Sequence, residues 1–185
     1  MKIETSELHE LVSAIEDSNL SIPEVIARIK GDGNSATELV EENIILTVDY
    51  SCTLQGMIDA GNYAWQNSDI TEKHFPLPAE LSGQKTTISS KLFHFDRDIS
   101  SKDAISEMEK AGYRPATLAE LLALGEAHPE LQKEFPIVAL GSVWRVGDGV
   151  RLVPVLGFDG DGRGLGLGWL DDGWDVNYRF FGVRK

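Results

Sequence analysis

The sequence predicts an α+β protein in which helices come first and a sheet closes the chain. Helical patterns recur through the first 130 residues, but the helical period is absent from Ile137 onward. Four strands separated by Gly and Asp turns are expected there, over residues 137–145, 150–156, 164–170 and 178–185. Helices followed by such strands favour an α+β fold with a mixed or antiparallel C-terminal sheet.

Composition narrows the class of protein. The 185 residues are 42% hydrophobic, which supports a folded core, and their formal charge is −13. This charge disfavours binding to nucleic acid or to an anionic membrane, because both would repel the chain. The sequence shows neither an export signal nor an apolar span. With Cys52 as its single cysteine, the chain is expected in a reduced compartment, either cytoplasmic or virion-associated.

The N-terminal part reads as a helical extension covering residues 1–43. Amphipathic helices are predicted over residues 6–17 and from Ser21 to about Gly31, and a third, acidic helix over 36–42. The main domain is then expected to cover residues 44–185.

The main domain begins with short, mixed elements. Residues 44–50, IILTVDY, are rich in β-branched side chains and predict a strand, and residues 53–60 predict a helix closed by Gly61. Residues 62–87 have little periodicity and are expected to be irregular, whereas residues 92–96 alternate as a strand does.

Two helices are expected before the final sheet. Ser100 or Ser101 caps a helix that runs through Lys110 and is stopped by Gly112. Pro115 and Thr117 begin a second helix that continues through Glu126.

The segment 163–170, RGLGLGWL, carries the most functional information. Leu165, Leu167 and Trp169 alternate with three glycines, and a strand places the two sets on opposite faces. The large residues are expected to face the core, which leaves a face without side chains. Because glycine destabilises a strand, two explanations stay open: another backbone approaches closely or the strand bulges, or this face is a surface not selected for packing.

The C-terminal part resembles the variable proteins of diversity-generating retroelements. The resemblance rests on YRPATLAELLALGE, IVALGSVWR, GLGLGWLDDGWDVNYRF and the closing VRK, between residues 112 and 185. Such proteins display a variable patch on a C-type lectin fold, and adenine-specific mutagenesis during reverse transcription rewrites their codons, typically AAY. The resemblance implies a variable region at about residues 145–185.

Carried onto this sequence, the resemblance divides the region into variable and fixed positions. The variable, ligand-binding candidates are Val150, Leu152, Val155, Gly157, Gly164, Gly166, Gly168, Asp172, Asp175, Asn177 and Tyr178. The implied fixed scaffold is Leu165, Leu167, Trp169, Trp174 and Phe180, with Trp174 anchoring the loop around it. The expected partner is an unknown protein or surface ligand, and an oligomer is possible.

Metal and cofactor motifs are incomplete. DGDGRG at 159–164 resembles the start of a calcium loop, but Arg163 occupies a ligand position and Leu170 replaces the bidentate glutamate. Asp171, Asp172 and Asp175 favour a solvated acidic turn over a calcium site. The glycine run fits neither G-x-G-x-x-G nor a Walker motif, so no metal and no cofactor are expected.

Two alternatives to a display protein remain from the sequence. YRPATLAELLAL is also similar to a segment of formylglycine-generating, sulfatase-modifying enzymes, whose chemistry uses paired cysteines in the C-terminal part. Cys52 lies far upstream and has no partner cysteine, so we expect no catalytic residues and no enzyme activity. The other alternative is a viral structural or assembly component.

Overall fold

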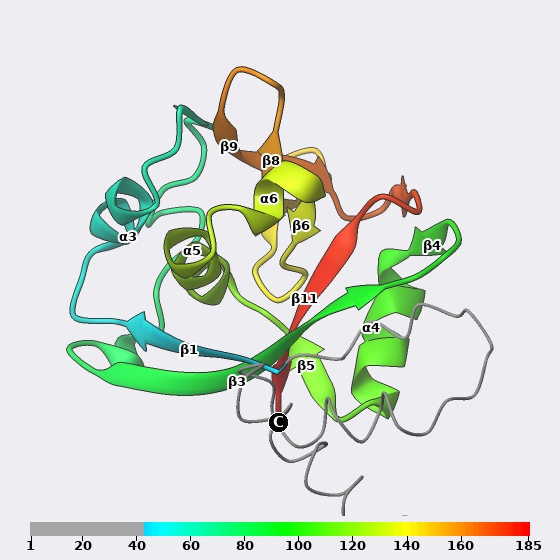
Figure 1. Cartoon of the computed structure of the whole chain (residues 1–185). Helices are drawn as coiled ribbons and strands as arrows, with labels where there is room; N and C mark the ends of the chain where they lie inside the picture. Colours follow the sequence, from blue (N-terminus) through cyan, green and yellow to red (C-terminus); the bar gives the residue numbers. More distant parts are fainter. Residues whose placement is uncertain (1–42) are drawn as a thin grey trace, which may run out of the picture. The chain divides into compact units, whose positions relative to one another are not determined.

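The computed structural model describes residues 43–185, which form an α+β fold around one large mixed sheet (Figure 1). The sheet order is β1-β3-β11-β6-β8-β9-β2, with β5 also pairing with β11 and β7 with β8, while β10 and β4 form a separate pair. In chain order the elements are β1 (Ile44–Asp49), α3 (Leu54–Ala60), β2 (Trp65–Gln66), the 3-10 helix η1 (Ala79–Leu81), β3 (Lys85–His94), β4 (Ile99–Ser100), α4 (Ser101–Lys110), β5 (Tyr113–Pro115), α5 (Leu118–Ala127), α6 (Leu131–Glu134), β6 (Ile137–Val138), β7 (Trp144–Arg145), β8 (Arg151–Phe158), β9 (Arg163–Trp169), β10 (Gly173–Trp174) and β11 (Arg179–Arg184).

Most neighbouring strands in the sheet are antiparallel. The exceptions are β6 with β11 and β2 with β9, which pair in parallel. The long β8–β9 hairpin pairs Leu152 with Trp169 at one end and Phe158 with Arg163 at the other. The carboxylate of Asp159 closes the turn, because its Oδ1 accepts the backbone N–H groups of Asp161 and Gly162, both at 3.1 Å.

Local capping explains where the two longer helices begin. Ser100 caps α4, its hydroxyl accepting the N–H of Asp103. Thr117 and Glu120 form a reciprocal capping box at the start of α5. Glu120 is buried and pairs with Arg114 at 2.6 Å, so its charge is compensated inside the fold.

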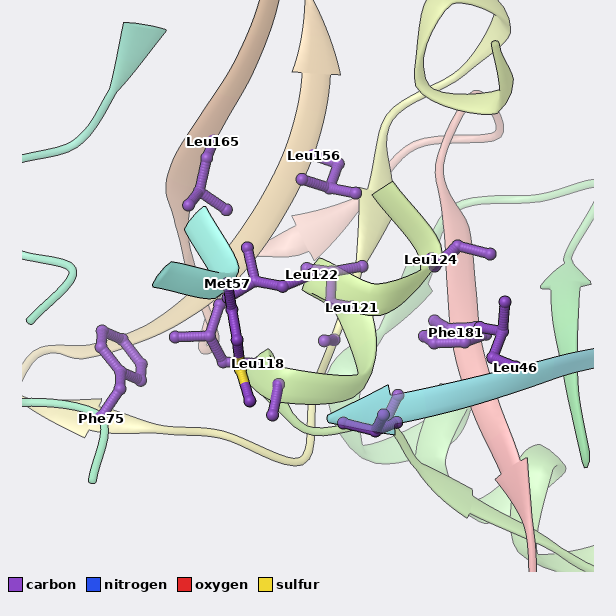
Figure 2. Close-up of a cluster of buried hydrophobic side chains, with 14 of the residues drawn as sticks. Leu46, Met57, Phe75, Leu118, Leu121, Leu122, Leu124, Leu156, Leu165 and Phe181 are labelled. Carbon is purple, nitrogen blue, oxygen red and sulfur yellow. The ribbon is translucent and has the colours of Figure 1, made fainter. Parts of the chain in front are cut away.

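Two buried clusters lie on opposite faces of the sheet. The larger one joins α5 and α3 to the sheet through Leu121, Leu156, Leu165 and Phe181 (Figure 2). The second joins α4 to the other face through a group that includes Met108, Val153, Trp174 and Phe180. In β11, Phe180 and Phe181 therefore serve different clusters, as the alternation of a strand requires. α5 and α4 accordingly lie on either side of β11 (Figure 1).

The sequence located most of these elements. The strand at 44–50, the helix closed by Gly61 and the two capped helices are confirmed, with ends shifted by one residue or less. The strand expected at 92–96 is instead the long β3, and residues 137–145 form two short strands, β6 and β7. The short elements missed are β2, η1, β4, β5, α6 and β10. The helices predicted within residues 1–42 lie outside the described residues.

Candidate ligand-binding surface

The leucine side of β9 is buried as expected at Leu165, but it is exposed at the C-terminal end of the strand. Leu165 is fully buried and Leu167 is half-buried against the larger cluster. Trp169 is 62% exposed, so the prediction that it faces the core is wrong. Alternation does put Trp169 on the leucine side, beside Leu152, but the core that covers Leu165 does not extend to the end of the strand.

The glycine side of β9 is not bare, which corrects the expectation of a face without side chains. A methyl group on Gly164 would lie 3.3 Å from Trp65 Cε3, and one on Gly166 would lie 3.5 Å from Trp65 Cζ3. A methyl group on Gly168 would lie 2.8 Å from Trp174 Cη2. Two indole rings thus occupy the space that the glycines leave. The close approach is made by side chains and not by another backbone.

Gly168 consequently differs from the other two glycines. Trp174 is only 4% exposed and belongs to the second buried cluster, so it has little room to move away. A side chain at Gly168 would therefore have to displace Trp174, which makes this position the least tolerant of the three. Trp65, in contrast, is 55% exposed and can move toward solvent.

Most of the candidate positions within β8 and β9 share one side of the hairpin. Val155 pairs with Gly166 and Gly157 with Gly164, so all four point to the same side. We call the surface formed by Trp65, Val155, Gly157, Gly164 and Gly166 the glycine face. A methyl group on Gly157 would meet nothing within 4 Å. The glycine face therefore offers an open position at Gly157 beside the exposed indole of Trp65.

Val150 and Leu152 lie apart from this surface. Leu152 pairs with Trp144 on one side and with Trp169 on the other, which places it on the leucine side of the hairpin. Val150 precedes it by two residues and is 39% exposed. These two positions therefore lie outside the glycine face.

The loop after β9 is anchored by Trp174. Its Nε1 donates to Ser101 Oγ at 2.7 Å, and that hydroxyl donates to the carbonyl oxygen of Leu170 at 2.6 Å. Tyr178 packs edge-on against Trp174, with ring centroids 5.0 Å apart. The remaining candidates of this loop are exposed, namely Asp172, Asp175 and Asn177, and Asp175 Oδ1 accepts the N–H of Asn177 at 2.8 Å.

The backbone of the loop is held by residues outside the candidate set. Arg179 Nη1 donates to the carbonyl oxygens of residues 176, 177 and 178, at 3.1 to 3.3 Å. A ring nitrogen of His94 lies 2.9 Å from the carbonyl oxygen of Val176. Arg179 also stacks over Phe135 at 4.6 Å, and burial lowers the pKa of its guanidinium. These contacts fix the loop through its carbonyls, so they do not depend on its side chains.

The hairpin backbone is held in the same way from a buried residue of α6. Gln132 is 1% exposed, and its Nε2 donates to the carbonyl oxygens of Gly157 at 2.7 Å and Gly164 at 3.2 Å. α6 lies against β8 (Figure 1). Gln132 therefore supports Gly157 and Gly164 through their main chain.

Arg163, in the motif that resembled a calcium loop, has a structural role. Its guanidinium donates to the carbonyl oxygens of Gly61, at 2.7 Å, and of Gly125, at the ends of α3 and α5. A cation at helix C-termini offsets their partial negative charge. It also lies 5.0 Å from the ring of Tyr63, whose pKa burial raises to about 12.

Sequence reasoning missed Trp65, Gln132 and Arg179 as parts of this surface. Trp65 and Gln132 fall in segments where no periodic pattern assigns a partner. The hydrogen bonds of Arg179 go to main-chain carbonyls, which its charge alone does not predict.

No group of three His, Cys, Asp or Glu side chains that could hold a metal ion gathers within residues 43–185. No helix in that range is long and apolar enough to cross a membrane. An open hollow of about 410 Å³ lies beside Cys52 and is lined by Tyr50, Glu72 and Pro76 among others. Comparison of the chain with protein-family models, curated proteins and solved structures finds no match.

Proposed function

We propose that this chain is a non-enzymatic ligand-binding protein that displays replaceable side chains on a C-type-lectin-like domain. In this proposal, adenine-specific retroelement mutagenesis diversifies positions 155, 157, 164 and 166 of the glycine face and the loop that follows β9. The ligand is a protein or another surface-borne molecule. The acidic chain disfavours nucleic acid as the ligand.

One observation carries the proposal: main-chain carbonyls of the surface are held by side chains that do not belong to it. Gln132 holds the hairpin carbonyls, and Arg179 holds those of the loop. Fixed backbone with replaceable side chains is what a display surface needs, because each new side chain must leave the fold intact.

The geometry also reduces the set of positions assigned to the surface. Val155, Gly157, Gly164 and Gly166 lie on the glycine face, and Asp172, Asp175, Asn177 and Tyr178 lie in the adjoining loop. Gly168 is excluded because its side faces the buried Trp174. Val150 and Leu152 would form a separate contact region next to Trp169.

The decisive experiment is to sequence the DNA that flanks the gene. The proposal expects a second, near-identical copy of the segment that encodes residues 145–185, close to a reverse transcriptase gene. Differences between the two copies should fall at adenines of the template. Differences spread over all four bases, or the absence of a template copy, would contradict the proposal.

A separate measurement addresses the assembly alternative. The protein is compared with a variant in which Gly157 and Asn177 are both replaced by Tyr. A display surface predicts changed ligand selection with unchanged stability. If both proteins form the same stable oligomer and both fail to select ligands from a displayed peptide library, an assembly role is favoured instead.

A further inference from the structure

We propose that Trp65 is a fixed contact residue of the glycine face, and that side-chain size at positions 164 and 166 sets the position of its indole ring. The inference deepens the proposed function and depends on it only in treating the glycine face as a binding surface. Trp65 lies in β2, about a hundred residues upstream of the hairpin that it covers, so it stands outside the expected variable region.

The backbone at Trp65 is tied to β9 on both sides of the ring. The N–H of Ala64 donates to the carbonyl oxygen of Arg163 at 2.8 Å, and the N–H of Asn67 donates to that of Leu165 at 2.9 Å. Trp65 itself pairs with Gly164. These bonds use main-chain atoms only, so they persist whatever side chains positions 164 and 166 carry.

The ring is held less firmly than the backbone. Among the described residues, Trp65 belongs to neither buried cluster, and 55% of its surface is exposed. Its inner face lies over Gly164 and Gly166, where added methyl groups would stand 3.3 Å and 3.5 Å from ring carbons. A side chain that extends from Cβ toward the ring would overlap it, and the free direction for the ring is toward solvent.

Two states of the surface follow from this geometry. With glycine at both positions, the indole covers the β9 backbone and presents its outer face to a ligand. With a larger residue at either position, the indole is lifted and the new side chain takes its place. One substitution therefore changes two contact residues, and Trp65 contributes to specificity without itself varying. An exposed tryptophan is well suited to this role, because it offers a large rigid contact area.

The chain offers a matched control. Gly157 lies on the same face, directly opposite Gly164, but a methyl group there would meet nothing within 4 Å. Gly157→Leu adds the same side chain to the same surface as Gly166→Leu, at a position whose Cβ is not in contact with the ring of Trp65.

The test uses the isotopically labelled full chain and needs no ligand. In the parent protein, ring currents should shift the Hα signals of Gly164 and Gly166 upfield, and Trp65→Ala should abolish this shift. Gly166→Leu should remove the shift at Gly164 and increase quenching of Trp65 fluorescence by acrylamide, measured as the difference from the same protein carrying Trp65→Phe. Gly157→Leu should leave both signals as in the parent.

The inference is overturned if the glycine Hα signals are unchanged by Trp65→Ala, or if Gly166→Leu and Gly157→Leu affect Trp65 equally. The comparison of parent and Trp65→Ala decides the ring position even if Gly166→Leu does not fold. These readouts are independent of the flanking DNA. A missing template repeat would contradict the proposed diversification, but it would not bear on the position of the Trp65 ring.

Discussion

At the scale of single residues, Gly168 and Gly157 share one side of the hairpin but differ in the space around them. A methyl group at 168 would press on the buried ring of Trp174, whereas one at 157 would enter solvent. We expect Gly168→Ala to lower the free energy of unfolding by about 1–3 kcal/mol through overpacking. Gly157→Ala should be neutral, or stabilising by roughly 0.5–1 kcal/mol, because alanine loses less conformational freedom than glycine when the chain folds. Urea denaturation of both variants checks this, and equal effects would contradict the geometry.

The buried phenol of Tyr63 predicts how the stability of the fold depends on pH. Burial raises its pKa to about 12 from the usual 10, and within residues 43–185 its buried hydroxyl has no hydrogen-bond partner. The folded state thus favours the neutral phenol. The contribution of this pKa difference to the free energy of unfolding is fully present below pH 10. It is lost as the pH rises toward 12, because Tyr63 ionises first in the unfolded chain.

Tyr63→Phe tests this assignment. The variant should be at least as stable as the parent at pH 7, because an unpaired buried hydroxyl is removed. It should also lose less stability between pH 10 and 12. Thermal unfolding followed across that range measures both effects. Burial raises the pKa of Tyr50 as well, so the difference between variant and parent is the informative quantity. A parallel decline of the two proteins would refute the assignment to Tyr63.

At the scale of elements, β9 has a buried half and an exposed end. Leu165 is 0% exposed and Trp169 is 62% exposed, although both belong to the leucine side. Leu165→Ala should cost about 2–5 kcal/mol of stability, as expected for a large-to-small change in a core. Trp169→Ala should stay within roughly 0.5 kcal/mol, as for an ordinary surface site. Chemical denaturation of the two variants distinguishes them, and a large loss from Trp169→Ala would restore its predicted scaffold role.

The same strand shows what the sequence could and could not predict. Alternation located β9 and its two sides correctly, and capping residues located α4 and α5, because these signals are local. Exposure of Trp169 depends on where the covering core ends, which a local pattern does not encode. Likewise, the glycines are explained by Trp65 and Trp174, and Trp65 comes from a distant two-residue strand. Contacts of that kind arise only from the tertiary arrangement.

At the scale of the whole described domain, both buried clusters depend on one sheet. Phe181 and Leu156 face the cluster under α5, while Phe180 and Val153, in the same two strands, face the cluster beside α4. Loss of packing on either side should therefore loosen the strands on which the other side rests. We expect a single cooperative unfolding transition for residues 43–185.

Substitutions in the two clusters test this coupling. Leu121→Ala affects the first cluster and Met108→Ala the second, and each should cost about 2–5 kcal/mol because both side chains are fully buried. Far-ultraviolet circular dichroism reports the whole sheet. Tryptophan fluorescence reports Trp174 beside α4 when both variants are made in a protein whose Trp65, Trp144 and Trp169 are replaced by Phe. In each variant the two signals should shift to the same lower midpoint. If Leu121→Ala moved the dichroism midpoint and left the Trp174 signal in place, the clusters would be independent units, and the glycine face would rest on only one of them.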